Sequence, residues 1–322
     1  MTLEKIENKR EPYIANSTPT EYITSSRVIS YKRLWYKRLH YMLGFKNSVG
    51  LRKNFMFKKY HQMCQKKFVE RGGQIEKEYI GPGEEFRKNL YHIFPATKER
   101  KKLFDKIPQD LLAELDRPST VLQKFLFAHR LLLNPSQYQQ VQYLLTDEIQ
   151  MMMKSFFRSD FVVMSSYMFK TNPDPTAVPR SSFLWHLDEH PDCHMKMYFY
   201  LTDAKKDSGA IQYHSWEESK KLMWRGFWDR RNVPEDIQRD LDNEEDYSVA
   251  EVDRGTVMQF IPSFIHRAVI PVNMPRHVLV FEAIPAPEPN LDYRDCHMQF
   301  WEDPEDILSG KLKGTSPDQI DY

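Results

Sequence analysis

Eight short runs of aromatic, aliphatic and β-branched residues follow one another between residues 161 and 284, with turn residues between them. Runs of this length and spacing are typical of the strands of a β-sandwich or β-barrel. Eight strands are also the number in a jelly roll. We therefore expect a jelly-roll core. The runs begin at Phe161, Ser181, Met195, Gly209, Tyr247, Gly255, His266 and Arg276.

The first half of the chain has a different pattern. Thr120 with Gln123 and Ser136 with Gln139 have the spacing of helix-capping boxes, and each pair precedes an apolar-rich segment. We therefore predict helices over residues 121–133 and 138–157, and an α+β protein. The expected organisation is a mainly helical region over 1–158 packed on a β core over 159–288, then a tail over 289–322. An insertion at about 215–246, with two short helical segments, is a candidate lid.

Two copies of the motif His-x-Asp lie close together, His186-Leu187-Asp188 and His190-Pro191-Asp192. Side chains two residues apart lie on the same side of a strand, so such a pair can bind one metal ion. The motif is short, and about one copy is expected by chance in a chain of this composition. The first copy ends the apolar run FLW, whereas the second contains a proline, which favours a turn. We therefore favour His186 and Asp188.

A second histidine, His266, begins a later predicted strand. With His186 and Asp188 it would complete a face of two histidines and one carboxylate, which leaves open positions on iron(II). Ten residues further on, Arg276 begins an apolar strand, where a buried arginine needs an anionic partner. A dicarboxylate ligand would explain this arginine. The alternative is a structural arginine that pairs with Glu282.

From Trp185 to Pro285 the chain resembles the phytanoyl-CoA dioxygenase-like family of iron- and 2-oxoglutarate-dependent oxygenases. The segments that carry the resemblance are WHLD, KMYFYLTDAKKDSGAIQYHSWEESKK and GTVMQFIPSFIHRAVIPVNMPR. Tyr213 to Trp216 stand where the family usually has Pro-Gly-Ser-His, so this loop departs from the family pattern. The resemblance covers about a third of the chain and leaves the first 150 residues unassigned.

The resemblance implies a double-stranded β-helix, or cupin-like, fold and an enzyme that uses Fe(II), 2-oxoglutarate and O2. Such an enzyme releases succinate and CO2 as it hydroxylates its substrate. By the same resemblance His186, Asp188 and His266 are the metal ligands and the catalytic centre. Arg276 is then the contact for the distal carboxylate of 2-oxoglutarate.

Tyr198 is a further candidate contact of the co-substrate by the same resemblance, and Lys196 lies on the same predicted strand face. Two other functional interpretations stay open. One is a catalytically silent double-stranded β-helix that binds a ligand, and the other is a cupin-like metal enzyme that does not use 2-oxoglutarate.

The expected substrate is a small molecule, a sugar or a lipid-linked compound. Aromatic residues next to arginines in the candidate lid would suit a sugar, an aromatic ring or an anionic group. The alternative is that these side chains pack the lid onto the core. The candidate substrate contacts are Trp216, Trp224, Arg225 and Trp228.

The segment from Arg27 to Arg71 has thirteen lysines and arginines and one acidic residue, although the formal net charge of the chain is +1. Basic residues alternating with aromatic ones could contact an anionic membrane surface; a solvated helix face is the plainer alternative. Nucleic acid is less favoured, because no reading module is recognised. The three cysteines lack CxxC spacing, and no signal-peptide or membrane-spanning pattern is seen. We therefore expect a cytoplasmic protein, peripheral to a membrane if the basic segment binds lipid.

Overall fold

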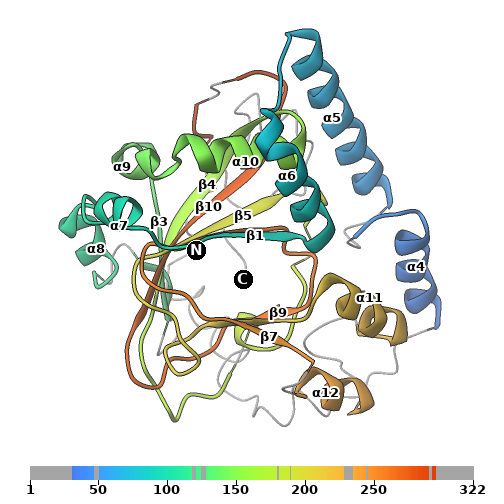
Figure 1. Ribbon diagram of the computed structural model, residues 1–322. Coiled ribbons are helices and arrows are strands. Elements are labelled where there is room, and N and C mark those ends of the chain that lie inside the picture. The colour runs from blue at the N-terminus through green and yellow to red at the C-terminus, as the bar shows by residue number, and fades with distance from the viewer. Residues whose placement is uncertain are drawn as a thin grey trace, which may run out of the picture.

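The structure is a computed structural model. It describes residues 31–46, 51–117, 121–124, 128–179, 181–188, 190–227, 235–243, 246–289 and 292–294. Two antiparallel β-sheets form the centre, and helices surround them (Figure 1).

The larger sheet has seven strands: β1 (Tyr91–Phe94), β2 (Val121–Lys124), β3 (Ala128–Leu132), β4 (Asp160–Thr171), β5 (Met195–Tyr200), β8 (Val257–Phe260) and β10 (Arg276–Ala286). Their order is β1-β8-β5-β10-β4-β3-β2. The smaller sheet has the order β7-β6-β9, with β6 at Ile211–Tyr213, β7 at Ser248–Ala250 and β9 at His266–Arg267.

The helices before β4 are α4 (Tyr31–Met42), α5 (Leu51–Glu70), α6 (Lys77–Asn89), α7 (Lys98–Phe104), α8 (Gln109–Glu114), α9 (Pro135–Val141) and α10 (Asp147–Phe157). Two helices lie in the later insertion, α11 (Trp216–Arg225) and α12 (Glu235–Leu241). Short 3-10 turns are present at Gln142–Leu144 and Ser181–Phe183. None of the described helices combines the length and the apolar composition needed to cross a bilayer.

Neighbouring residues of β5 and β10 point to opposite faces of the large sheet, because side chains alternate along a strand. The rings of Phe199 and Phe281 contact Phe104 of α7 and Tyr138 of α9, at centroid distances of 6.3 and 5.3 Å. This outer face is therefore part of the hydrophobic core with the helices. The opposite, inner face meets the small sheet. Strand register places on it Lys196, Tyr198 and Tyr200 of β5, Arg276, Val280 and Glu282 of β10, and Tyr167 and Phe169 of β4.

The helix predicted over residues 121–133 is wrong. This segment forms β2 and β3, which pair with each other and extend the large sheet beyond β4. The apolar run is compatible with the periodicity of a helix and with that of a strand, and backbone pairing with β4 favours the strand. The observed capping box lies further on, where the Asn134 side chain accepts a hydrogen bond from Gln137 N and the Gln137 side chain bonds back to Asn134 N.

The helix predicted over 138–157 is present, but it is divided between α9 and α10. The β1–β3 strands come from the region expected to be mainly helical, so the first half of the chain also supplies part of the large sheet. The two short helices predicted in the insertion are present as α11 and α12. Residues 181–188 were expected to form a strand. Instead they form a 3-10 turn and a single bridge at His186.

Candidate metal centre

His186, Asp188 and His266 come together between the two sheets. One possible ligand atom from each lies within 4.8 Å of the others. The backbone positions them, because His186 and His266 exchange two N–H···O bonds of 3.0 Å and Asp188 N donates to Pro262 O at 3.1 Å. Within the described ranges, no other group of three or more His, Cys, Asp or Glu side chains is close enough to hold a metal ion.

The two imidazoles are oriented by their own backbone. His186 Nδ1 lies 2.8 Å from Leu184 O, and His266 Nδ1 lies 2.9 Å from Phe264 O. A carbonyl oxygen only accepts hydrogen bonds, so each Nδ1 carries the proton and each Nε2 has a lone pair to offer. The Nε2 atoms lie 3.5 and 3.8 Å from the Asp188 carboxylate oxygens. This donor set fits a divalent transition metal such as iron(II).

A buried network of charges continues from Asp188 into the large sheet. Lys196 Nζ donates to Asp188 Oδ2 at 2.7 Å and lies 3.7 Å from Glu282 Oε1. Glu282 is fully buried and accepts a hydrogen bond of 2.9 Å from the Tyr167 hydroxyl. Its other oxygen lies 3.6 Å from His194 Nε2. Every charge in this network therefore faces an opposite charge or a hydrogen-bond donor.

The pKa values of the network follow from these contacts. Burial raises the pKa of Asp188, but the Lys196 ammonium and the neighbouring histidines outweigh it and bring the pKa well below its ordinary value. Burial acts the same way on Glu282, yet its contacts with His194 and Lys196 lower the pKa to about 2. Burial lowers the pKa of Lys196, and the two carboxylates more than reverse this effect. At neutral pH both acids are therefore ionised and the lysine is protonated.

Arg276 is the buried charge at the far end of the same inner face. Its Nη1 donates to Gly209 O at 2.5 Å, and its Nη2 lies 3.4 Å from Thr171 Oγ1. Its Nε has no hydrogen-bond partner, and the Tyr200 hydroxyl nearby has none either in the described part of the chain. Burial lowers the pKa of Arg276.

The alternative in which Arg276 pairs with Glu282 is wrong, because Glu282 is engaged by Lys196, Tyr167 and His194. Within the described residues, no carboxylate forms an ion pair with Arg276. A buried guanidinium whose Nε has no hydrogen-bond partner, next to a hydroxyl without one, could hold an anion.

Gly209 makes the contact to Arg276 possible. Its φ is +88°, a conformation that favours glycine. A Cβ at this position would lie 3.0 Å from Pro271 Cγ and 3.1 Å from Val269 O. Only a glycine therefore brings the carbonyl of residue 209 to the guanidinium without strain.

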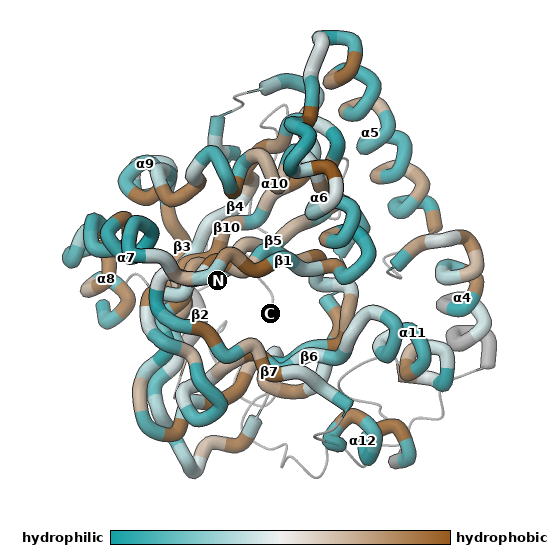
Figure 2. Tube along the Cα trace, viewed as in Figure 1, coloured by the Kyte–Doolittle hydropathy of each residue, from teal (hydrophilic) through white to brown (hydrophobic). Residues whose placement is uncertain are grey.

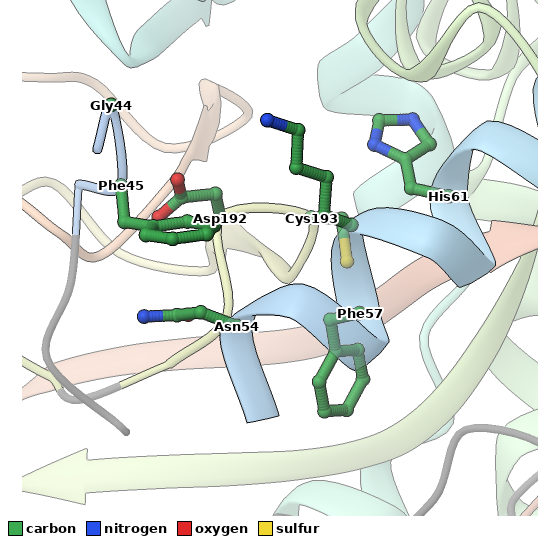
Figure 3. A pocket seen from close by; sticks show the side chains of 8 residues that line it. Gly44, Phe45, Asn54, Phe57, His61, Asp192 and Cys193 are labelled. Carbon is green, nitrogen blue, oxygen red and sulfur yellow. The ribbon is translucent and has the colours of Figure 1, made fainter. Parts of the chain in front are cut away.

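The second His-x-Asp copy is divided between two places. Asp192 accepts hydrogen bonds of 3.0 and 3.1 Å from Lys46 N and lines a pocket of about 180 Å³ between α5 and the loop after Asp188 (Figure 3). The His190 ring lies 4.2 Å from the His194 ring, and its Nε2 is 3.9 Å from Asp188 Oδ2. The structure thus groups the first copy, and not the second, with His266.

The insertion is fastened to the residues beside the two histidines. Asp242, just after α12, accepts hydrogen bonds from Trp185 Nε1 at 2.9 Å and Arg267 Nη1 at 3.1 Å. The Arg267 guanidinium lies 4.2 Å from the centre of the Trp185 ring. The insertion therefore packs directly behind the metal-site backbone.

The predicted substrate contacts in the insertion have other neighbours. Trp216 is partly buried against the core, and Trp224 is 46% exposed with the Arg38 guanidinium 5.2 Å from its ring. Arg225 forms ion pairs with Asp236 and Asp240 of α12. Trp228 lies outside the described residues. Their role toward a substrate stays a prediction.

The sequence did not identify Tyr167, or Glu282 as the shared neighbour of Lys196 and His194. One signal was available: Glu282 interrupts the apolar run VLVFEAI, just as Arg276 precedes it. A charge in a central strand indicates a buried partner, but only strand register identifies Lys196 as that partner.

No protein-family model matches the sequence, and the search of curated proteins gives no match. Solved structures are similar in part. AviO1 from Streptomyces viridochromogenes Tue57 has 13% identity and a TM-score of 0.45, covering 67% of this chain and 98% of that one. HygX from Streptomyces hygroscopicus with nickel and 2-oxoglutarate bound has 13% identity and a TM-score of 0.44, and the match covers 70% of this chain and 93% of that one. EctD from S. alaskensis with bound Fe has 13% identity and a TM-score of 0.48, and the match covers 63% of this chain and 75% of that one.

Proposed function

We propose that the protein is a non-haem iron(II), 2-oxoglutarate-dependent oxygenase on a double-stranded β-helix, of the phytanoyl-CoA dioxygenase-like type. The observation that carries this proposal is the combination of two features on one inner surface. One is a cluster of two histidines and a carboxylate with oriented Nε2 atoms. The other is a buried arginine that has no carboxylate partner in the described part of the chain.

In this proposal His186, Asp188 and His266 hold the metal, and Arg276 with Tyr200 holds the distal carboxylate of 2-oxoglutarate. Tyr198 lies on β5 between Lys196 and Tyr200, on the same face of the strand. When bound, iron(II) and 2-oxoglutarate supply the oxidation of a substrate C–H bond by O2, with release of succinate and CO2.

The side chains of this protein orient the reactants and shield them from water. Lys196 donates to one oxygen of Asp188 and fixes the orientation of this carboxylate, which would hold the metal together with the two histidines. The rings of Phe260 and Phe264 lie 6.0 and 5.6 Å from the His266 ring and cover it from solvent. The proposed reaction is hydroxylation of a small molecule, a sugar or a lipid-linked compound, with the insertion as the lid.

One observation favours a second candidate, a catalytically silent ligand-binding protein. An ammonium 2.7 Å from Asp188 partly neutralises the charge that a metal ion would otherwise balance. If Lys196 takes the place of the metal, Arg276 would still bind an anion, but without iron.

The weak visible absorption band of the iron(II)–2-oxoglutarate chelate, recorded without oxygen, separates these candidates. We expect a band in the wild type and no band in His266→Ala. In Arg276→Met the band should appear only at higher concentrations of 2-oxoglutarate. Lys170→Met, at an exposed ion pair on the neighbouring strand, is the matched control. A folded wild type that binds 2-oxoglutarate equally well with and without iron(II), and gives no band, would support the silent protein instead.

A further inference from the structure

Helices α4 and α5 run along one outer edge of the molecule, with α4 beside α11 (Figure 1). The inner face of α5 is fixed to the large sheet. The side chains of Tyr60 and Cys64 pack against Val162 and Ile284, and the Tyr60 hydroxyl donates to Pro285 O at 2.6 Å. The opposite side of α5 has no described protein element packed on it, so its side chains are available to a partner.

This outer side of α5 is strongly basic. The exposed charged residues of α5 are Arg52, Lys58, Lys59, Lys66, Lys67 and Glu70, of which Lys58 lines the pocket beside Asp192. Five of the six are cations, and the one acid pairs with Lys66 at 3.6 Å. Arg52, Lys59 and Lys66 are spaced by seven residues, so they form a row along one side of the helix. The row gives this edge of the molecule a positive charge that the near-neutral chain as a whole does not have.

Apolar side chains are exposed along the same edge. Trp35 and Met42 of α4 are 62% and 65% exposed, and Leu43 follows them at 42%. In α5, Phe55 is 44% and Val69 69% exposed. Figure 2 shows the alternation of hydrophobic and hydrophilic residues along α5. Five large apolar side chains of these two helices and the turn after α4 are therefore in contact with water beside the cations of α5.

The two helices contact each other. The Tyr36 hydroxyl accepts a hydrogen bond from Leu51 N at 3.3 Å. The Phe45 and Phe55 rings pack edge to face at 5.1 Å, and Asp192 holds Lys46 N. Asp192 lies four residues after Asp188, so the basic edge is tied to the loop that leaves the metal site (Figure 3).

We propose that the α4–α5 edge binds the surface of an anionic lipid bilayer. Cations next to partly exposed aromatic and aliphatic side chains match a membrane interface, where the charges meet lipid phosphates and carboxylates and the apolar groups enter the headgroup region. Nucleic acid is the less suitable partner, because Met42, Leu43 and Val69 have no role on a phosphate backbone. This inference does not depend on the proposed enzymatic activity.

The test is co-sedimentation of the full chain with vesicles of phosphatidylcholine alone or with roughly one third phosphatidylserine. We expect binding to the anionic vesicles only, weakened by added salt. Each basic residue near such a surface contributes roughly fivefold in affinity, so Lys59→Glu/Lys66→Glu should lose at least about tenfold. Trp35→Ser/Met42→Ser should weaken the binding that remains at high salt.

The matched control is Lys101→Glu/Lys102→Glu, which makes the same charge change on exposed lysines of α7. It should keep wild-type binding. Equal losses in the control and the α5 variant would mean that net charge alone acts, and would overturn the proposal. The same conclusion follows if the wild type binds neither vesicle, or binds a DNA or RNA duplex more tightly than the anionic vesicles. Circular dichroism of each variant shows whether it is folded.

Discussion

The two ends of the inner face of the large sheet handle buried charge in opposite ways. At one end Asp188, Lys196 and Glu282 neutralise one another within a few ångströms. At the other end Arg276 is equally buried, yet it has only neutral acceptors among the described residues. Burying a charge without a partner costs several kcal/mol, so a chain keeps such a residue at a cost to stability. The difference shows that the charges are balanced within the described chain at the first end, whereas at the second end Arg276 has no anionic partner among the described residues.

The largest expected effect concerns stability, and it should differ in sign between the two ends. Glu282→Ala leaves Lys196, His194 and Tyr167 without their common partner, and should lower the free energy of unfolding by about 3–5 kcal/mol. Arg276→Met removes a charge that lacks a partner, and should leave the free energy unchanged or raise it by about 1 kcal/mol. Urea denaturation of the metal-free protein measures both. Similar losses in the two variants would remove the distinction between the ends.

Acid should lower the stability of the Asp188–Lys196–Glu282 end of the inner face, here called the compensated end. The pKa of Glu282 is lowered to about 2 in the folded protein, so its contribution is complete above the ordinary value near 4.5 and is lost as the pH falls toward 2. Over this window the loss should reach roughly 3 kcal/mol. Glu282→Gln should show a smaller loss between pH 4.5 and 2. Parallel pH profiles for the wild type and this variant would contradict the assignment.

Gly209→Ala should disturb only the Arg276 end of the inner face, here called the uncompensated end. The positive φ costs about 1–2 kcal/mol for a residue with a Cβ, and the contacts with Pro271 and Val269 add to it. Because the carbonyl of residue 209 must shift, affinity for 2-oxoglutarate should fall at least tenfold while metal binding is kept. Gly44→Ala is the control, since it has a φ of +82° but open space around it. An unchanged 2-oxoglutarate affinity in Gly209→Ala would show that this carbonyl does not position Arg276.

The smallest effect should come from the Tyr200 hydroxyl. Tyr200→Phe removes a buried polar atom that has no described partner, so stability should not fall. If the hydroxyl donates to the ligand, affinity for 2-oxoglutarate should fall about three- to tenfold. Urea denaturation measures the stability, and isothermal titration calorimetry measures the affinity for 2-oxoglutarate. A loss of stability with no loss of affinity would place the hydroxyl in a purely structural role.

The sequence predicted the grouping of His186, Asp188 and His266 better than the contacts around it, and the reason is physical. A His-x-Asp pair and a later histidine are local patterns, and the isolated bridge between His186 and His266 brings the three side chains together. The network around Glu282 depends on the register between β10 and β5, which pairs Glu282 with Lys196 across the sheet. Such register is set by long-range pairing, and no local pattern encodes it.

The error at residues 121–133 has the same origin. A capping-box spacing and a run of apolar residues suggested a helix, but the exposed edge of β4 offers backbone hydrogen bonds to β3. Tertiary pairing outweighs local propensity in such ambiguous segments. Strands with fewer alternatives, such as β5 and β10, were placed almost as predicted.

The most direct test of the central claim is anaerobic calorimetry of 2-oxoglutarate binding to the full chain, with and without iron(II). We expect one 2-oxoglutarate per chain, bound tightly only when iron(II) is present, with affinity reduced at least a hundredfold in Arg276→Met and metal-dependent binding lost in His266→Ala. An affinity for 2-oxoglutarate that is the same with and without iron(II), and the same in Arg276→Met, would contradict this account. The account is that the compensated end holds a metal and the uncompensated end binds a carboxylate.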